Sequence, residues 1–361
     1  MSQAVNVSIS KYNKLLPLTI GGFALICIII YAIYGHLAKQ EIKAELLHEL
    51  EIKTKSTHDF INKRFIENKA MLHFLFSTPP VQGITRAINN QGIDPFDGTT
   101  TKQWKNRLET IFSAFITNNP EIRQIRYITK LNSGRELVRV ERQDNKVVIL
   151  SDGLLQNKQE TDYYKAIEQL HINEDYISDI TLNREYGIIE DPIWPTYRVA
   201  RPIFDKEYQF FGFLILNIDA TSLLAQLQHE YSKSDFNLYL LNTDGYFVSA
   251  KNEAMTFGFD LDNHDATWSK LTNTTKLIND ETIHEVLFNQ KPYYMYGKNV
   301  RLSLRDFRSL NIVGAVAENN INQIWQDQRE FVLIIISSLF VLFFILAVFY
   351  QRYINKILRL Y

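Results

Sequence analysis

Two uncharged stretches, one near each end of the chain, constrain this sequence more than any other feature. Leu15 to Tyr34 and Phe331 to Tyr350 each have 20 residues without Asp, Glu, Lys or Arg. At about 1.5 Å of rise per helical residue, each run matches a hydrocarbon layer of roughly 30 Å. The first run is longer than the apolar part of a usual signal peptide, and no small-residue cleavage site precedes a soluble start. We therefore predict two transmembrane helices, at residues 15–34 and 331–350.

Cationic residues beside these two runs predict how the chain crosses the membrane. The flanking cations are Lys11, Lys14, Arg352, Lys356 and Arg359. Because Lys and Arg concentrate on the cytoplasmic side, residues 1–14 and 351–361 are predicted to be cytoplasmic and 35–330 extracytoplasmic. A two-pass protein of a bacterial inner membrane, with residues 35–330 in the periplasm, is the simplest setting.

The pattern between the runs predicts an α+β fold that begins with a long helix. No glycine occurs between Gly35 and Gly83, and apolar residues recur there at helical spacing. A second amphipathic helix is expected at 102–116. We assign residues 35–118 to a stalk helix and covering helices.

Two similar hairpin signals then indicate a duplication. Strand-like runs flank Asn132-Ser133-Gly134, and a second pair flanks Thr243-Asp244-Gly245. Each copy ends in an apolar strand that runs into a helix, the first with Asp219 placed to cap that helix. We predict two tandem modules of antiparallel sheet with helices on their faces, at 119–231 (distal) and 232–318 (proximal).

The last helix is predicted to start near Asn319 and to continue without a break through the second apolar run. No glycine or proline follows Gly314, so nothing in this stretch favours a kink. Motion of the second module could therefore pass along this helix.

Motifs and charge exclude several functions. The sequence has 39 Lys and Arg against 40 Asp and Glu, so it has no basic excess for nucleic acid. The single cysteine, Cys27, cannot form an intrachain disulfide. Nucleotide-binding, zinc-protease, nucleophile-elbow and CxxC motifs are absent. We predict no catalytic residues, no cofactor and no enzymatic activity for the residues present.

One acidic cluster could ligate calcium through hard oxygens. It consists of Asp260, Asp262, Asn263 and Asp265. The cluster lacks the glycine and the terminal Glu of an EF-hand loop. We therefore predict no metal site, and expect Asp265 to cap a short helix instead.

A group of arginines and aromatic residues in the first copy is the best candidate site. Its predicted members are Arg126, Arg139, Arg198 and Arg201 on strands, with Tyr127, Tyr163, Tyr164, Tyr176, Trp194 and Tyr197. Guanidinium groups bind carboxylates or phosphates through bidentate hydrogen bonds, and aromatic rings can enclose a small ligand. The alternative is structural, with Glu136 and Glu141 pairing the arginines and the tyrosines packing in the core.

At this point the chain resembles a known family, the double Cache (tandem PAS-like) sensor domains of bacterial histidine kinases, diguanylate cyclases and chemoreceptors. The strings IRYITKLNSGRELVRVER, LQNKQETDYYKAI, DYISDITLNREYGIIEDP and YRVARPIF carry the resemblance, which is to the branch related to quorum-sensing kinase ectodomains. It implies two PAS-like modules on one stalk, a homodimer formed through the long helix, and a small-molecule pocket in the distal module. The ligand, by this reading, is a small organic anion or another metabolite.

Residue by residue, the resemblance points to a set of ligand-binding positions, to which Tyr127 is added from the aromatic group. These are Arg126, Glu136, Arg139, Asn157, Lys158, Tyr163, Tyr164, Tyr176, Ser178, Asn183 and Arg198. The amino-acid-binding branch of the family has Arg-x-Trp-Tyr where this sequence reads Thr161-Asp162-Tyr163-Tyr164. The sequence therefore disfavours an α-amino acid as ligand.

Three function classes remain open, of which the third is an enzyme, for which no motif speaks. The first is the sensing region of a longer transmembrane receptor, because 351–361 reads as the start of an output linker. The enzymatic activity of that missing output domain stays open. The second is an anchored platform that docks a periplasmic binding protein. A pocket in the distal module would favour the first function, and a large exposed apolar patch the second.

Overall fold

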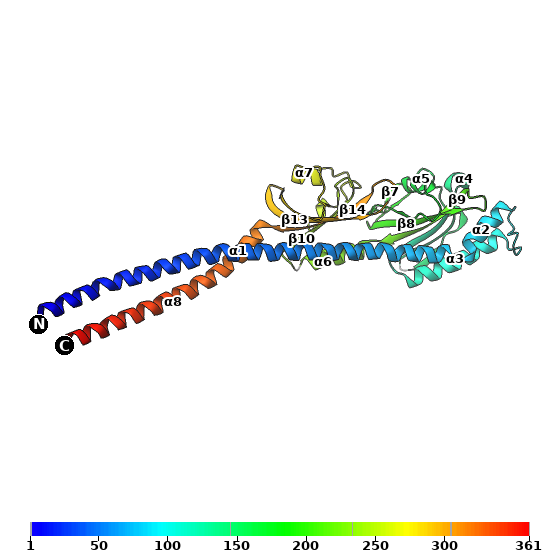
Figure 1. Cartoon of the computed structure of the whole chain (residues 1–361). Helices are drawn as coiled ribbons and strands as arrows, with labels where there is room; N and C mark the ends of the chain where they lie inside the picture. The colour runs from blue at the N-terminus through cyan, green and yellow to red at the C-terminus, as the bar shows by residue number, and fades with distance from the viewer. Residues whose placement is uncertain (1, 145, 233, 304, 361) are drawn as a thin grey trace. The chain divides into compact units, whose positions relative to one another are not determined.

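The computed structural model describes residues 2–144, 146–232, 234–303 and 305–360, with side chains of the terminal helices described from 15 to 357. The chain divides into two compact units. One is Leu50–Ala315, and the other combines Met1–Glu49 with Val316–Tyr361. Figure 1 shows the helices and strands of both units.

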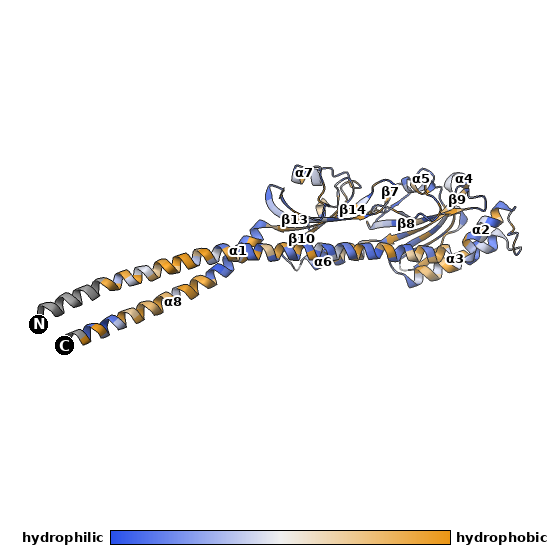
Figure 2. Cartoon of the chain, viewed as in Figure 1, coloured by the Kyte–Doolittle hydropathy of each residue, from blue (hydrophilic) through white to orange (hydrophobic). Residues whose placement is uncertain are grey.

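The terminal unit is built from two long helices, α1 (Ser2–Phe76) and α8 (Glu318–Leu360). Each predicted apolar run lies inside one of these helices and is orange in Figure 2. The Phe23 and Phe343 rings stack with centroids 3.9 Å apart. The predicted long first helix and the uninterrupted last helix are confirmed. Among the cations used to predict the orientation across the membrane, Lys11, Lys14 and Arg359 have side chains outside the described residues. The orientation of the two helices across a membrane stays a prediction.

The first sheet of the Leu50–Ala315 unit is antiparallel and has the order β3-β2-β1-β9-β8-β4, with β5 also paired to β8. Its strands are β1 (Ile122–Thr129), β2 (Glu136–Gln143), β3 (Lys146–Ile149), β4 (Tyr176–Ile177), β5 (Thr181–Leu182), β8 (Pro195–Phe204) and β9 (Phe210–Asp219). A separate two-stranded hairpin consists of β6 (Arg184–Glu185) and β7 (Ile188–Ile189). We call this sheet and its helices the first module.

The first predicted hairpin joins β1 to β2, and Arg126 pairs with Arg139 across it. Its turn, α4 (Leu131–Gly134), holds Asn132, Ser133 and Gly134 at φ values of 49°, 60° and 74°. Asn tolerates this left-handed region better than most residues, and Gly adopts it freely. A Cβ on Gly134 would also lie 2.7 Å from the backbone nitrogen of Gln159, so the position requires glycine.

The second module is a five-stranded sheet in the order β11-β10-β14-β13-β12. Its strands are β10 (Phe236–Leu241), β11 (Phe247–Ser249), β12 (Ile283–Phe288), β13 (Lys291–Arg301) and β14 (Ser309–Ala317). The predicted second hairpin is confirmed as β10 and β11, which pair antiparallel. Strand β14 continues directly into α8 in the sequence, as predicted.

Shorter helices cover the sheets. They are α2 (Pro79–Asn89), α3 (Thr101–Asn118), α5 (Asp162–Glu168), α6 (Thr221–Ser232) and α7 (Trp268–Thr272), with 3-10 turns η1 (Asp152–Leu154) and η2 (Glu253–Met255). The predicted covering helix is α3. Asp219 accepts a hydrogen bond from the Thr221 backbone nitrogen at 2.8 Å, so its predicted role at the start of α6 is confirmed.

Part of α1 packs against both sheets of this unit (Figure 1). The Asn68 amide donates to the Tyr197 hydroxyl on β8 at 2.5 Å. Further back along α1, Thr54 lies so close to Gly314 of β14 that a Cβ there would be 2.1 Å from the threonine hydroxyl. The α2 helix covers the same face of the first sheet, where Tyr127 bonds Thr85 at 2.9 Å. This helix-covered face leaves the opposite face of the first sheet for the candidate site.

The predicted cap at Asp265 is wrong. Helix α7 begins at Trp268, its cap position is Thr267, and Asp265 instead pairs with Lys270 at 2.6 Å. A capping side chain accepts a hydrogen bond from a backbone nitrogen of the first turn, as Asp219 does at α6, whereas the Asp265 carboxylate accepts from the Lys270 side chain. Within the described residues, no group of three or more His, Cys, Asp and Glu side chains could hold a metal ion.

Candidate ligand-binding site

A cavity of about 840 Å³ lies beside α5 on the face of the first sheet opposite α1 and α2. Strands β1 and β8 form its floor, and residues 155–163 and 176–187 form its walls. Seven of the twelve predicted ligand-binding residues line it. They are Arg126, Asn157, Lys158, Tyr163, Tyr176, Ser178 and Arg198.

Arg126 on β1 is a buried cation with spare hydrogen-bonding capacity. Its side chain is 3% exposed, and Nη1 lies 3.3 Å from Glu136 and 3.5 Å from the Tyr163 hydroxyl. Its Nε is buried and finds no hydrogen-bond partner among the described residues. Burial opposes the charge, but Tyr163 and the carboxylates of Glu136 and Glu185 outweigh this effect and raise the pKa of Arg126.

Arg198 on β8 is held more loosely. Its Nη atoms lie 3.5 Å from the Thr181 hydroxyl and 3.4 Å from the Asn183 carbonyl, both long for hydrogen bonds. The guanidinium carbon lies 5.4 Å from the centre of the Tyr163 ring. In the described part of the chain its buried Nε also lacks a hydrogen-bond partner. Burial and the neighbouring Arg126 lower the pKa of Arg198.

Lys158 adds a third cation to the cavity wall. The residue is 8% exposed and its Nζ donates to the Gln156 side chain at 2.5 Å. Burial, and then repulsion from Arg126, lower the pKa of Lys158 to about 8. A bound anion would stabilise its protonated form.

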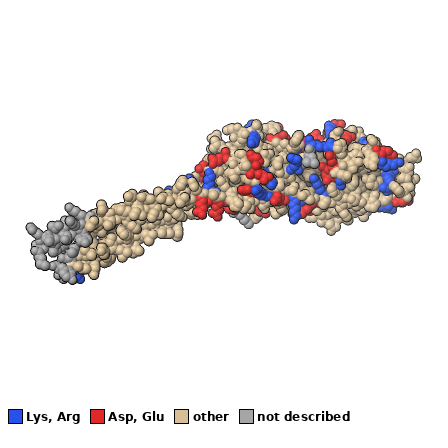
Figure 3. Space-filling view, in the orientation of Figure 1, with Lys and Arg blue, Asp and Glu red and all other residues tan. Residues whose placement is uncertain are grey.

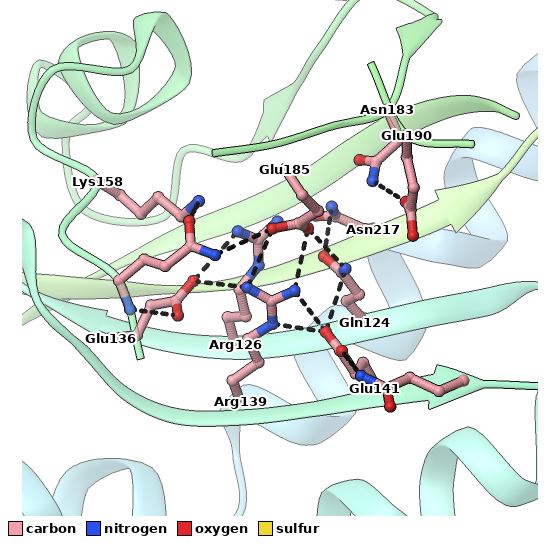
Figure 4. A network of polar contacts seen from close by, with 12 residues as sticks. Gln124, Arg126, Glu136, Arg139, Glu141, Lys158, Asn183, Glu185, Glu190 and Asn217 are labelled. Atoms are coloured by element: carbon pink, nitrogen blue, oxygen red, sulfur yellow. Dashed lines mark hydrogen bonds and ion pairs between the residues drawn. The ribbon is translucent and has the colours of Figure 1, made fainter. Parts of the chain in front are cut away.

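Arg139 belongs to a saturated network beside the cavity (Figure 4). Its guanidinium lies 2.5 Å from Glu141, 3.0 Å from Glu185 and 3.8 Å from Glu136. Burial disfavours the charge of Glu185, but Arg139 and Arg126 more than offset this effect and lower the pKa of Glu185 to about 2. Arg139 lines a second cavity of about 590 Å³, which shares Gln156 and Tyr186 with the first. The structural alternative therefore describes Arg139 better than a ligand-binding role.

Four further predicted residues lie behind the cavity wall. Tyr127 faces α2, because neighbouring residues on a strand point to opposite faces and Arg126 takes the cavity side. Tyr164 turns into the core, 5.4 Å from the Phe213 ring. Glu136 is fully buried and accepts from Arg126 and from the Gln156 backbone at 3.0 Å. Asn183 supports Arg198 and donates to Glu190 at 2.8 Å.

The other residues of the predicted arginine and aromatic group also lie elsewhere. Arg201 is on the helix-covered face, with its guanidinium 5.3 Å from the Phe76 ring centre. Tyr197 is on that same face, against Phe65. Trp194 lines the second cavity. The sheet therefore gathers three of the four predicted arginines and directs the fourth away.

Several lining residues were missed at the sequence level, among them Asp179, Arg184, Tyr186 and Asp260. Glu185, which anchors the hairpin to Arg139, was missed as well. Arg184 and Glu185 lie in the string DYISDITLNREYGIIEDP, but the strand that holds them has two residues and no periodicity to detect. Asp260 follows them by more than 70 positions, so only the tertiary structure brings it to the cavity.

Comparisons with known proteins agree with this architecture. Residues 88–279, which are 192 of the 361, match the family described as bacterial histidine kinase, sensor domain. The extracellular domain of a protein described as histidine kinase vpHK1S-Z8 is 18% identical with a TM-score of 0.56, and the match covers 79% of this chain and 94% of that one. A comparison with curated proteins returned no match.

Two other solved structures share the fold. One is a domain described as belonging to a sensory box/GGDEF family protein from Vibrio parahaemolyticus, at 18% identity and a TM-score of 0.57, covering 79% of this chain and 99% of that one. The other is the sensory domain of the Campylobacter jejuni chemoreceptor Tlp3 with isoleucine bound, at 14% identity and a TM-score of 0.52, covering 79% and 97%. At these identities the likeness concerns the fold alone.

Proposed function

Because this chain belongs to the family of bacterial histidine kinase sensor domains, we propose that it senses a small anionic molecule in the first-module cavity and signals its presence across a membrane. The two long apolar helices that flank the sensor domain would be its transmembrane helices. The sensor then lies in the periplasm of a two-pass inner-membrane receptor, with the first module distal to the membrane. An output domain of kinase, cyclase or chemoreceptor type, and a homodimer formed through α1, belong to the same proposal.

The observation that carries this proposal is a pair of guanidinium groups with unused donors at one cavity. The Nε atoms of Arg126 and Arg198 are both buried and unpaired within the described residues. A buried unsatisfied donor costs about 1–3 kcal/mol, and an oxyanion would satisfy both. Lys158 supports the same ligand chemistry, because it adds a third cation to the cavity and its lowered pKa of about 8 means that a bound anion would stabilise the charged form.

The charge of the ligand can be separated from its shape by a matched set of probes. Isoleucine, which is bound in the Tlp3 relative, is a zwitterion, and 3-methylpentanoate has the same carbon skeleton without the amine. Inorganic phosphate tests an anion of another geometry. Arg126, Lys158 and Arg198 all line the cavity, so we expect the carboxylate and phosphate to bind without an amine.

The test is isothermal titration calorimetry on the full chain in lipid nanodiscs. We expect at least one anionic probe to bind the wild type, and Arg198→Met to weaken it about tenfold or more, since a hydrogen bond to a charged group contributes about 1.5–3 kcal/mol. Arg201→Met is the matched control, because Arg201 lies on the same strand and faces away from the cavity. Equal affinities in the wild type and in Arg198→Met, with any probe that binds, would refute this site.

The docking platform has one observation in its favour. Tyr186 and Ile188, on the hairpin beside the cavity, are 72% and 73% exposed. If no anion binds and a periplasmic binding protein from the same source protects Tyr186 from chemical modification, the platform is the better proposal.

A further inference from the structure

The wall of the first-module cavity is completed by a residue of the second module. Asp260 lies in the segment between β11 and α7, and it lines the cavity together with Leu182 and Arg184. Its carboxylate accepts a hydrogen bond from the Leu182 backbone nitrogen at 2.7 Å. The same carboxylate pairs with Arg184 at 3.1 Å. The first-module cavity therefore has a boundary that the first module does not supply.

Asp260 is fixed on its own side by the backbone. The Phe257 nitrogen donates to the Phe247 carbonyl of β11 at 2.8 Å, and the Asp260 nitrogen donates to the Phe257 carbonyl at 2.9 Å. The Asn263 nitrogen closes the turn onto the Gly258 carbonyl at 2.9 Å. A displacement of Asp260 would thus be passed to a strand of the second sheet.

The β6–β7 hairpin is held from two sides. Arg184 reaches out to Asp260, while its neighbour Glu185 reaches in to Arg139 and Gln124, at 3.0 Å in each case. Successive residues of a strand point to opposite sides, so this hairpin can hold both contacts at once. The ion pair of Asp260 with Arg184 and that of Arg139 with Glu185 are therefore linked through the backbone of the hairpin.

The two contacts of Asp260 are unequal. The side chain of Arg184 is 42% exposed, and ion pairs at such positions contribute little because water screens them. The Asp260 side chain is 9% exposed, and a backbone N–H that donates to a carboxylate makes a strong, charge-assisted bond. The bond from Leu182 is therefore the main attachment.

We propose that Asp260 is a positioning residue of the ligand cavity, through which the second module sets the position of the cavity wall at Leu182 and Arg184. The proposal rests on the proposed function in that the cavity is taken as the ligand site. A ligand that moves this wall changes the second module, and a change in the second module alters affinity by the same factor, since coupling free energy is reciprocal.

The test uses hydrogen–deuterium exchange of the full chain in nanodiscs without added ligand. Asp260→Ala should speed exchange of the Leu182 amide by about tenfold or more, because one charge-assisted bond is lost. Asp260→Asn, which keeps an acceptor oxygen and the shape, should show a smaller increase. Asp262→Ala is the matched control, since that side chain is in the same loop and 95% exposed.

Arg184→Ala removes only the weaker contact of Asp260, so it should change exchange of the Leu182 amide and of amides in 257–263 less than Asp260→Ala does. Faster exchange confined to 257–263 in both Asp260 variants, with Leu182 unchanged, would overturn the proposal. If Asp260→Ala fails to fold, Asp260→Asn decides in the same way. Because no ligand is added, the exchange result judges Asp260 alone. Failure of 3-methylpentanoate, isoleucine and phosphate to bind the wild type would count only against the proposed function.

Discussion

Arg198→Met should make the unliganded protein more stable while removing its ligand response. Arg198 makes two long hydrogen bonds and leaves its Nε unpaired. No carboxylate among the described residues lies within ion-pair distance of it. The unliganded protein thus keeps a cation in the cavity wall without a carboxylate partner, and Met is an apolar side chain of similar length.

The size of the effect follows from those contacts. Replacing a buried ion pair by apolar side chains is often neutral or stabilising by about 1–4 kcal/mol, and removal of Arg198 leaves no carboxylate unpaired. Part of this gain is offset because the cation over the Tyr163 ring contributes about 0.5–1 kcal/mol. We expect a net gain of about 1–2 kcal/mol, or a Tm higher by roughly 2–6 °C for a chain of this size.

Arg139→Met should have the opposite effect on stability and serves as the comparison. This change leaves Glu141 and Glu185 buried without their cation, which should cost about 3–5 kcal/mol. Both variants are compared by thermal unfolding of the ligand-free full chain in nanodiscs, with circular dichroism to check the fold. If Arg198→Met loses stability as Arg139→Met does, Arg198 is a structural residue and our reasoning about its unused donors fails.

Three further predictions concern protons and signal transfer. Because the pKa of Lys158 is about 8, anion affinity measured by calorimetry should fall as pH rises through about 8. Lys158→Met should remove this pH dependence of the affinity. Lys165→Met, on the exposed side of α5, should retain it. The pKa of Glu185 is lowered from 4.5 to about 2, so its contribution of roughly 3 kcal/mol is present above pH 4.5 and lost as pH falls toward 2. Urea unfolding should therefore show a stability gap between wild type and Glu185→Gln that is large near neutral pH and smaller near pH 3; a constant gap would contradict the assignment. Inserting three glycines between Asn322 and Gln323 of α8 should abolish ligand-dependent output of the full-length receptor without changing ligand affinity, and normal output would exclude α8 as the route.

The sequence correctly predicted the helices and turns whose signals lie within a short stretch of the chain. Helix α1 has an apolar periodicity and lacks internal glycine over the stretch that follows the first apolar run. The β1–β2 turn uses Asn132 and Gly134 at positive φ, a conformation these residue types tolerate. The predicted family resemblance agrees with the match of residues 88–279. Each of these signals is contained in a short segment or in an ordered series of segments.

The side chains that line the cavity were harder to predict from the sequence. The sequence placed Arg198 and Arg201 on one strand, but which face of that strand meets the helices depends on how α1 packs. Tyr127 and Arg126 are adjacent in the chain and face opposite sides for the same reason. Asp260 looked like part of a calcium loop because its actual partners, Leu182 and Arg184, lie in another module.

The order of contacts along α1 means that the two modules are nested in the chain. The helix first meets β14 of the second module at Thr54 and then β8 of the first module at Asn68. Between these points Thr57 lies 3.1 Å from Tyr231 of α6, the helix that leads back to the second sheet. The first module is thus a continuous insertion, entered after Thr57 and left at Tyr231. Exchange of ligand-sensing modules between receptors, in evolution or by gene splicing, needs only these two neighbouring junctions, whereas a single crossover in α6 would place Thr54 of one receptor against the β14 strand of the other.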